Sequence, residues 1–321
     1  MEVNAAVVRS FDRPPRYERF EMPEAHGKHE VEVEVLAVGL HPRVRSGAYG
    51  SHYTSTGRLP MIPGIDGVGL SVEGRLLYFV ADDEMLGSMA ERTVIDLRRT
   101  VPLPDGADLV QIAAAMNPAM SSWVALRRRV PLQAGQSVLV LGATGNAGQM
   151  AVQIAKHLGA ERVVGAGRDR ERLDLLTTMG ADDVVQLTDE PDETAAALAE
   201  TAANVDLVLD YLWGAPARIA MMALLKERTD RSRELNWIQI GAIAGPTIEL
   251  PSVALRSANL RLQGNGQGAV STDAYLAELP SLIEEIDAGG LRMRGKTVPL
   301  AEVESTWSLD DAPGERTVFV P

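Results

Sequence analysis

A glycine-rich turn carries the clearest chemical potential in this sequence. Residues 137–148 read SVLVLGATGNAG, a β-branched run followed by small residues. A dinucleotide site needs a tight turn at the strand end, a residue without a side chain near the pyrophosphate, and a small residue where helix packs on strand. Ala143, Gly145 and Gly148 hold these three places.

Such a turn can bind phosphate groups without basic side chains. The N–H groups at a helix start are free, and the positive end of the helix dipole attracts anions. The alternative, a glycine-rich turn without a ligand, is disfavoured by the strand, helix and second strand around it. The sequence thus predicts cofactor contacts at Ala143, Thr144, Gly145, Asn146, Ala147 and Gly148.

The end of the second predicted strand bears on the choice of cofactor. In NAD-binding proteins an acidic residue, about 20 residues beyond the glycine turn, binds the ribose 2′-hydroxyl. Here Gly167 takes that place and Arg168 follows. Because a guanidinium suits a 2′-phosphate, the sequence predicts NADPH, with Arg172 as a second candidate contact. The alternative is that both arginines are solvated and that Asp169 caps the next helix.

Composition limits the possible functions. The 321 residues are 45% hydrophobic and 23% charged, which predicts a globular protein of two domains. Cysteine is absent, so disulfides, Cys-ligated zinc, iron–sulfur clusters and thiol nucleophiles are excluded. With 31 Lys and Arg against 44 Asp and Glu, the net charge of −13 repels a phosphate backbone, and we expect no nucleic-acid partner.

The N-terminal residues show no basic flank before a long apolar core, and we find no run of about 18 apolar residues. We therefore expect a cytoplasmic protein without a membrane partner.

Periodicity predicts the elements that position these residues. In residues 31–36 valine alternates with glutamate, which is typical of a strand with one buried face. Gly, Pro and Ser cluster in 47–57 and 60–69, which we interpret as loops. From about residue 108, short β-branched runs alternate with amphipathic stretches, as in βαβ units. The predicted strands there are 138–141, 162–164, 183–187, 205–210, 237–240 and 260–263, with helices at 147–158, 171–179 and, in the tail, 273–288.

Several further motifs occur in a fixed order along the chain. They are VGLHP at 38–42, RSGAY at 45–49, PGIDGVG at 63–69, GSMAE at 87–91, MSSWVAL at 120–126, QIGA at 239–242 and QGNG at 263–266. With the glycine turn, they make the chain resemble, nearly end to end, the zinc-independent quinone oxidoreductase branch of the medium-chain dehydrogenase/reductase superfamily.

The resemblance implies an α/β fold of two domains. A GroES-like β-barrel substrate domain would consist of residues 1–117 plus 265–321, and a Rossmann domain with a doubly wound parallel sheet, residues 118–264, would be inserted in it. Relatives commonly dimerise by pairing Rossmann edge strands, which nominates 260–263 for a homodimer contact. The zinc-bearing relatives carry cysteine where His41 stands and histidine where Ile65 stands, so the resemblance implies a site without metal.

Hydride transfer without zinc needs an acceptor whose charge is already delocalised, such as a quinone or an α,β-unsaturated carbonyl. Tyr49 is the first candidate proton donor, because its loop is similar to one in which metal-free enoyl-thioester reductases place a tyrosine. His41 is the second, as a donor or relay. Either side chain can instead be purely structural, and Asp66 is expected to brace the loop more readily than to act as a base.

The resemblance also nominates cofactor contacts far from the glycine turn. Ser121 takes the place of a threonine near the nicotinamide ribose, and the strand before Gly241 and Ala242 passes the nicotinamide, to which the loop with Asn265 and Gln267 returns. The leading interpretation is an NADPH-dependent reductase of quinones or enones. The alternatives are an NADPH-binding regulatory protein with weak or no turnover, and an enoyl-thioester reductase.

Overall fold

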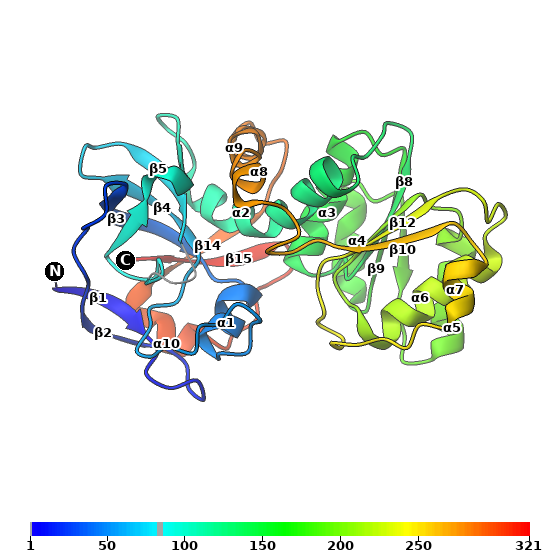
Figure 1. The fold of residues 1–321 in the computed structure, drawn as a ribbon, viewed down its shortest axis with the longest axis horizontal. Helices are drawn as coiled ribbons and strands as arrows, with labels where there is room; N and C mark the ends of the chain where they lie inside the picture. Colours follow the sequence, from blue (N-terminus) through cyan, green and yellow to red (C-terminus); the bar gives the residue numbers. More distant parts are fainter. Residues whose placement is uncertain (1, 82–85) are drawn as a thin grey trace. The chain divides into compact units, whose positions relative to one another are not determined.

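The computed structural model describes residues 2–81 and 86–321. The chain forms two compact units, one of residues 1–117 and 279–321 and one of residues 118–278. The first division falls inside helix α2 (Leu109–Val124), beside Pro118. Figure 1 shows the chain coloured from its N-terminus to its C-terminus.

The first unit is a mixed β structure with short helices. Its larger sheet has seven strands in the order β14-β15-β3-β4-β5-β7, with β6 paired to β3, while β1 and β2 form a separate antiparallel pair. The strands are β1 Glu2–Val7, β2 Arg16–Glu21, β3 Glu30–Gly39, β4 Asp66–Ser71, β5 Leu76–Val80, β6 Arg92–Asp96, β7 Thr100–Pro102, β14 Arg294–Pro299 and β15 Glu315–Val320. The helices are α1 Pro42–Ala48, α9 Leu279–Asp287 and α10 Val303–Thr306, with single turns at Leu97–Arg99 and Leu300–Glu302.

The two ends of the chain meet in this sheet. Strand β15 pairs antiparallel with β3, Val318 opposite Gly39 and Phe319 opposite Val38. The first unit is therefore discontinuous in sequence, as a GroES-like domain with an insertion requires.

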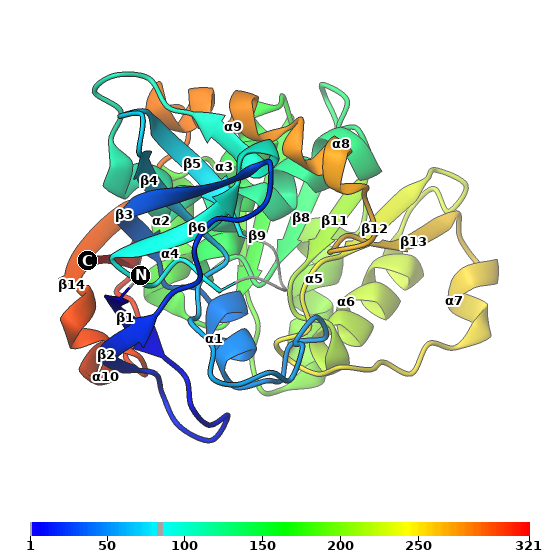
Figure 2. The ribbon, with the colours of Figure 1, turned by 60° about the vertical axis from the view of Figure 1, so that its left-hand side comes forward.

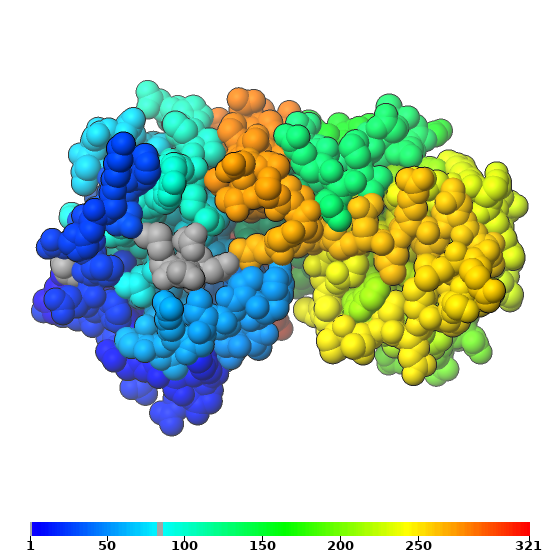
Figure 3. All heavy atoms as spheres, in the orientation of Figure 1, coloured from blue at the N-terminus to red at the C-terminus, as the bar shows by residue number. Residues whose placement is uncertain are grey.

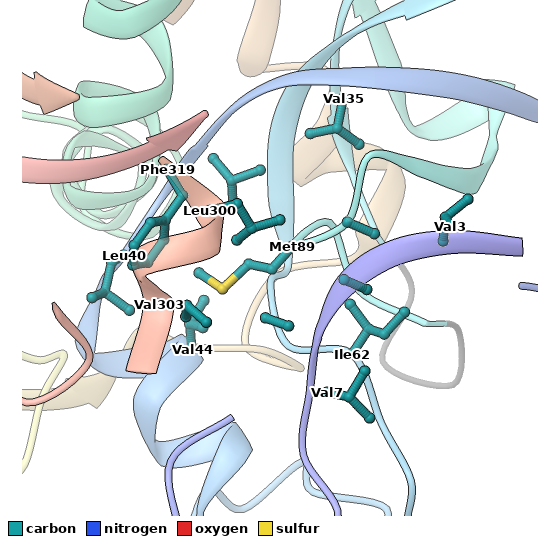
Figure 4. Close-up of a cluster of buried hydrophobic side chains, with 14 of the residues drawn as sticks. Val3, Val7, Val35, Leu40, Val44, Ile62, Met89, Leu300, Val303 and Phe319 are labelled. Carbon is teal, nitrogen blue, oxygen red and sulfur yellow. The ribbon is translucent and has the colours of Figure 1, made fainter. Parts of the chain in front are cut away.

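Alternating side chains of these strands build the core of the first unit. Val33 and Val35 of β3 are buried while Glu34 between them is exposed, which confirms the predicted strand. Figure 4 shows Met89 among side chains from the N-terminal strands and the C-terminal segment, including Leu300 and Val303. The C-terminal segment thus supplies part of the core, which joins it to the first unit by apolar burial.

The second unit contains a six-stranded sheet in which every neighbouring pair is parallel. The strand order is β10-β9-β8-β11-β12-β13, so the chain reverses direction across the sheet between β8 and β11. Ligands of such doubly wound sheets bind at the carboxyl ends of the strands at this switch point. The strands are β8 Ser137–Leu141, β9 Arg162–Gly167, β10 Asp183–Gln186, β11 Leu207–Asp210, β12 Leu235–Gln239 and β13 Leu260–Gly264.

Helices connect and cover these strands. Helix α3 buries Ala151, Ile154 and Ala155, which recur at helical spacing on one face. Helices α5 and α6 pack against each other beside the sheet (Figure 2). The helices are α3 Asn146–His157, α4 Arg170–Thr178, α5 Pro191–Ala202, α6 Gly214–Glu227, α7 Ser252–Arg256 and α8 Thr272–Leu276, and a π-turn at Ala125–Arg129 continues α2.

The tail of the chain differs from the sequence prediction. In place of the helix expected at 273–288, the structure has two helices, α8 and α9. The helix is interrupted just before Pro280, because proline lacks an N–H and clashes with the preceding turn. Residues 265–278 belong to the second unit rather than to the first. Buried Glu278 explains this grouping, since it accepts hydrogen bonds from Trp123 Nε1 (3.1 Å) and Arg127 Nε (2.6 Å).

One stretch of the described chain, Leu109–Arg129, has the length and hydropathy of a membrane span, although the sequence analysis found none. Of its most apolar window, 72% is buried inside the protein, which is typical of a core helix.

Candidate cofactor and catalytic sites

The glycine turn follows β8 directly and has the conformation that its residues predict. Gly142 takes a φ of +85°, in the left-handed region that favours glycine. A Cβ on Gly148 would lie 2.5 Å from Ala143 Cα and still closer to the Gly142 carbonyl oxygen. Helix α3 therefore packs against the turn so closely that only glycine fits at position 148.

Gly145 is a glycine for a different reason. Its backbone is extended, with φ of −79°, and the nearest atom to an added Cβ would be Gly142 O at 3.6 Å, an ordinary contact. The fold of the described residues thus does not require glycine here, although the residue is exposed at the start of α3. Within the described chain, the residue at the N-cap position of α3 is Gly145 itself, which supplies no side-chain cap. A bare backbone beside an uncapped helix start fits the pyrophosphate of a dinucleotide.

The structure brings several predicted cofactor residues together beside the ends of β11 and β12. Ser121 Oγ lies 3.0 Å from Tyr211 Oη, and Asn265 Nδ2 donates to Ser121 O at 2.8 Å. Gly241 passes so close to Tyr211 that a Cβ would lie 2.6 Å from the Tyr211 carbonyl oxygen. Tyr211 therefore joins Ser121 to Gly241, and Asn265 joins the cluster through Ser121. Tyr211 was not among the residues predicted from the sequence.

Tyr211 lies at the carboxyl end of β11, where ligands of such sheets bind. It is the first residue after β11, the neighbour of β8 at the switch point. Asp210 holds the turn that follows, since its carboxylate accepts hydrogen bonds from the N–H groups of Leu212 and Trp213, both at 2.9 Å. Burial raises the pKa of Tyr211 to about 12, so the phenol stays protonated at neutral pH and serves as a fixed hydrogen-bonding group.

Ala242 and Gln267 are the other two residues nominated for this part of the cofactor site. Ala242 is exposed, and its carbonyl accepts a hydrogen bond from the N–H of Gly245 at 3.2 Å. Gln267 pairs through its backbone with Val270.

The two predicted phosphate-binding arginines lie in different surroundings. Arg168 is exposed, and its side chain forms no ion pair with the residues that the structure describes. Arg172 is mostly buried, with Nη1 3.5 Å from Thr144 O in the glycine turn and Nε 3.3 Å from Asp169 Oδ2. Asp169 also caps α4 by accepting from the Arg172 N–H at 3.1 Å. Of the two arginines, Arg172 is the one in contact with the turn.

In the first unit, His41 belongs to a buried polar chain. His41 and Asp66 are 1% and 2% exposed, and His41 Nε2 lies 3.2 Å from Asp66 Oδ1. Tyr78 Oη donates to the other carboxylate oxygen at 2.7 Å. Asp66 therefore braces its surroundings, as the sequence analysis favoured. His41 Nδ1 is buried and forms no hydrogen bond with the described residues.

Burial shifts the pKa of two residues in the first unit, His41 and Arg316. Burial lowers the pKa of His41 below its usual 6.5, although Asp66 opposes the shift, so the imidazole is neutral at neutral pH. Arg316 is also buried and donates to Leu40 O at 3.0 Å. Burial lowers its pKa to about 10, which leaves the guanidinium charged.

Tyr49 lies at the C-terminal end of α1 and is 38% exposed. Its N–H donates to Arg45 O at 3.0 Å. Among residues 2–81 and 86–321, no hydrogen bond joins its phenol to His41.

Across residues 2–81 and 86–321, no group of three or more His, Asp or Glu side chains is placed to hold a metal ion.

Comparison with known proteins identifies the family. A family model described as zinc-binding dehydrogenase matches residues 147–229. A probable NADPH-dependent quinone reductase of Emericella nidulans, tdiC, is 31% identical over 364 residues, which cover 99% of this chain and 100% of that protein. The chain belongs to the medium-chain dehydrogenase/reductase family, in its quinone oxidoreductase-like branch.

Two other members of this family extend the comparison. The quinone oxidoreductase of Thermus thermophilus, whose crystal structures include a complex with NADPH, is 27% identical with a TM-score of 0.82, over 99% of this chain and 100% of that one. An NADPH-dependent alkenal/one oxidoreductase of Arabidopsis thaliana is 29% identical over 177 residues, which cover 50% of this chain and 46% of that protein. The two-unit α/β architecture is thus that of the quinone oxidoreductase-like family.

Proposed function

We propose that this protein is an NADPH-dependent oxidoreductase that reduces a quinone or an α,β-unsaturated carbonyl compound. The observation that carries the proposal is the bare, uncapped start of α3 beside Arg172, at the switch point of the sheet. The full-length likeness to a probable NADPH-dependent quinone reductase and the partial likeness to an alkenal/one oxidoreductase support this acceptor class.

Residues of the second unit would hold the cofactor. Backbone N–H groups of the glycine turn bind the pyrophosphate, and Arg172 with Arg168 binds the 2′-phosphate. Ser121, Tyr211 and Asn265, with Gly241, form the wall for the nicotinamide ribose. When bound, NADPH supplies the hydride, and the protein contributes position and exclusion of water.

In the first unit we propose Tyr49 as the proton donor to the oxygen where negative charge develops. Its phenol is partly exposed, whereas His41 is buried with Nε2 directed to Asp66. His41 then acts chiefly by holding the start of α1, where its carbonyl accepts hydrogen bonds from the N–H groups of Val44 (3.0 Å) and Arg45 (3.1 Å).

The test is an acceptor panel with purified full-length protein. NADPH oxidation is followed with quinones, enones, 2-alkenals and enoyl thioesters, each before and after dialysis against EDTA. We expect turnover with quinones or enones that EDTA leaves unchanged, since the proposed chemistry uses no metal.

Each other outcome of the panel points elsewhere. Turnover confined to enoyl thioesters would instead identify the protein as an enoyl-thioester reductase. Binding of NADPH without oxidation across the panel would contradict the enzymatic proposal and favour a regulatory role, and loss of activity in EDTA would contradict a metal-free reaction.

We further propose a homodimer formed through β13, the edge strand of the parallel sheet, and a cytoplasmic location. Strand β13 pairs with β12 alone, which leaves its other edge without a partner strand in the described chain. Figure 3 shows the segment that carries it at the surface of the second unit. Leu262 on this strand is 37% exposed.

A further inference from the structure

We propose that Thr144 is a specificity-determining residue for the cofactor, because its side chain occupies the space that an acidic side chain at position 167 would need. The inference rests on the proposed binding of NADPH. Packing against Thr144 excludes an Asp or Glu side chain at position 167, so the residue types at positions 144 and 167 depend on each other.

The geometry at Gly167 points to Thr144 alone. A Cβ added to Gly167 would lie 2.8 Å from Thr144 Oγ1 and 3.1 Å from Thr144 Cβ, and closest of all to Thr144 Cγ2. All three nearest atoms thus belong to one side chain. The φ of Gly167 is outside the left-handed region, so its backbone conformation does not require glycine. The contact with Thr144 is therefore the reason that a glycine stands here.

Neither backbone can shift easily to relieve this contact. Gly167 pairs with Gln186 of β10, and its carbonyl accepts the Leu187 N–H at 2.7 Å. The Thr144 carbonyl accepts Gln149 Nε2 at 3.1 Å. Rotation of the Thr144 side chain does not clear the space either. Threonine carries two heavy atoms on Cβ, Oγ1 and Cγ2, so a rotation that moves one of them away can bring the other into its place.

The same threonine links the steric block to the positive charge nearby. The Thr144 carbonyl also lies 3.5 Å from Arg172 Nη1, and Asp169 holds the other side of that guanidinium. Gly167 thus offers no carboxylate to a 2′-hydroxyl, and the nearby carboxylate of Asp169 is already paired with Arg172. Arg172 in turn provides a positioned guanidinium for a 2′-phosphate. Both features favour the phosphorylated cofactor.

The packing step is tested first, without any cofactor. Gly167→Ala, Thr144→Ala and the double variant are compared with wild type by thermal unfolding. Gly167→Ala should lower the midpoint by about 5 °C, and Thr144→Ala in the same chain should restore most of that loss, a non-additive result. Gly264→Ala is the matched control, because its added Cβ would meet nothing nearer than 3.9 Å. A Gly167→Ala protein as stable as the control would overturn the steric block.

The specificity step is tested by titrating NADPH and NADH into Gly167→Asp, with and without Thr144→Ala. NADH binding should strengthen at least about tenfold in the double variant, as expected for a carboxylate on the 2′-hydroxyl, and not in Gly167→Asp alone. If Gly167→Asp folds only when Thr144→Ala is present, the block is supported as well. Equal gains of NADH binding in both proteins, or a gain in neither when both fold, would sink the inference.

Failure of the proposed function gives a different result. Wild-type protein would then bind neither nucleotide, or would bind NADPH without oxidising it with any acceptor of the panel. The unfolding comparison would still decide whether Thr144 and Gly167 are coupled.

Discussion

Tyr49 and His41 lie eight positions apart, yet their surroundings suit different tasks. Tyr49 ends helix α1 and is partly exposed, whereas His41 begins the same helix and is almost completely buried. The sequence alone left both as candidate donors, because burial is not visible in a motif. The hydrogen bond of His41 to Asp66 and its lowered pKa favour Tyr49 as the donor.

At this scale the first prediction concerns Tyr49→Phe, which removes only the phenolic oxygen. We expect kcat for the best acceptor to fall about 100-fold, the usual contribution of a positioned acid, with no change in NADPH affinity. Steady-state kinetics and nucleotide titration measure the two quantities. Tyr53→Phe is the control, since Tyr53 is 72% exposed. A Tyr49→Phe enzyme with wild-type kcat would exclude the phenol as the donor.

A second prediction follows from the pKa of His41. Burial lowers this pKa in the folded protein, so below the unfolded value of about 6.5 the unfolded chain binds a proton that the folded chain resists. Stability is therefore fully present above pH 6.5 and falls as the pH decreases, by at most about 1.4 kcal/mol per pH unit. His41→Asn should flatten this dependence in urea unfolding between pH 7.5 and 5.5. Parallel pH profiles for the two proteins would contradict the assignment.

Secondary structure was predictable wherever one period dominated a segment. Strand β3 contains the predicted residues 31–36, and the strands of the parallel sheet were all located, because each is a short apolar run between helical stretches. Strand β4 was missed, and part of it was interpreted as a loop. Strand β4 contains Gly67 and Gly69, and an added Cβ would come within 3.2 Å of Ala37 O and 2.8 Å of Glu34 O, respectively. Glycine is therefore needed where β4 approaches β3. Close approach to β3, which glycine composition cannot reveal, explains this error.

The edge strand β13 carries the prediction at the scale of elements. An edge strand has unpaired N–H and C=O groups and pairs readily with a second copy, unless a charge blocks it. Leu262→Lys should therefore convert a dimer to a monomer, as measured by size-exclusion chromatography with light scattering. Leu309→Lys, at an exposed leucine of the first unit, should leave the dimer intact. A monomeric wild type, or a Leu262→Lys protein that remains dimeric, would contradict the proposed interface.

For the whole molecule, the sequence indicated two units and the residues of the glycine turn, but not how distant segments meet. Tyr211 joins Ser121 to Gly241 only because the strand order places β11 and β12 side by side. Likewise, Arg172 and Thr144 are 28 positions apart and meet because α4 follows β9 beside the turn. A net charge of −13 is compatible with a phosphate-rich ligand, since the backbone amides of the glycine turn and the guanidinium of Arg172 would supply the local attraction.

Nucleotide titration of the wild-type protein tests the central claim most directly. Isothermal calorimetry with NADPH and with NADH, at one ionic strength, should give a dissociation constant at least about tenfold lower for NADPH. Arg172→Ala should reduce that difference. Equal affinity for the two nucleotides, or binding of neither, would contradict the assignment of an NADPH-dependent oxidoreductase.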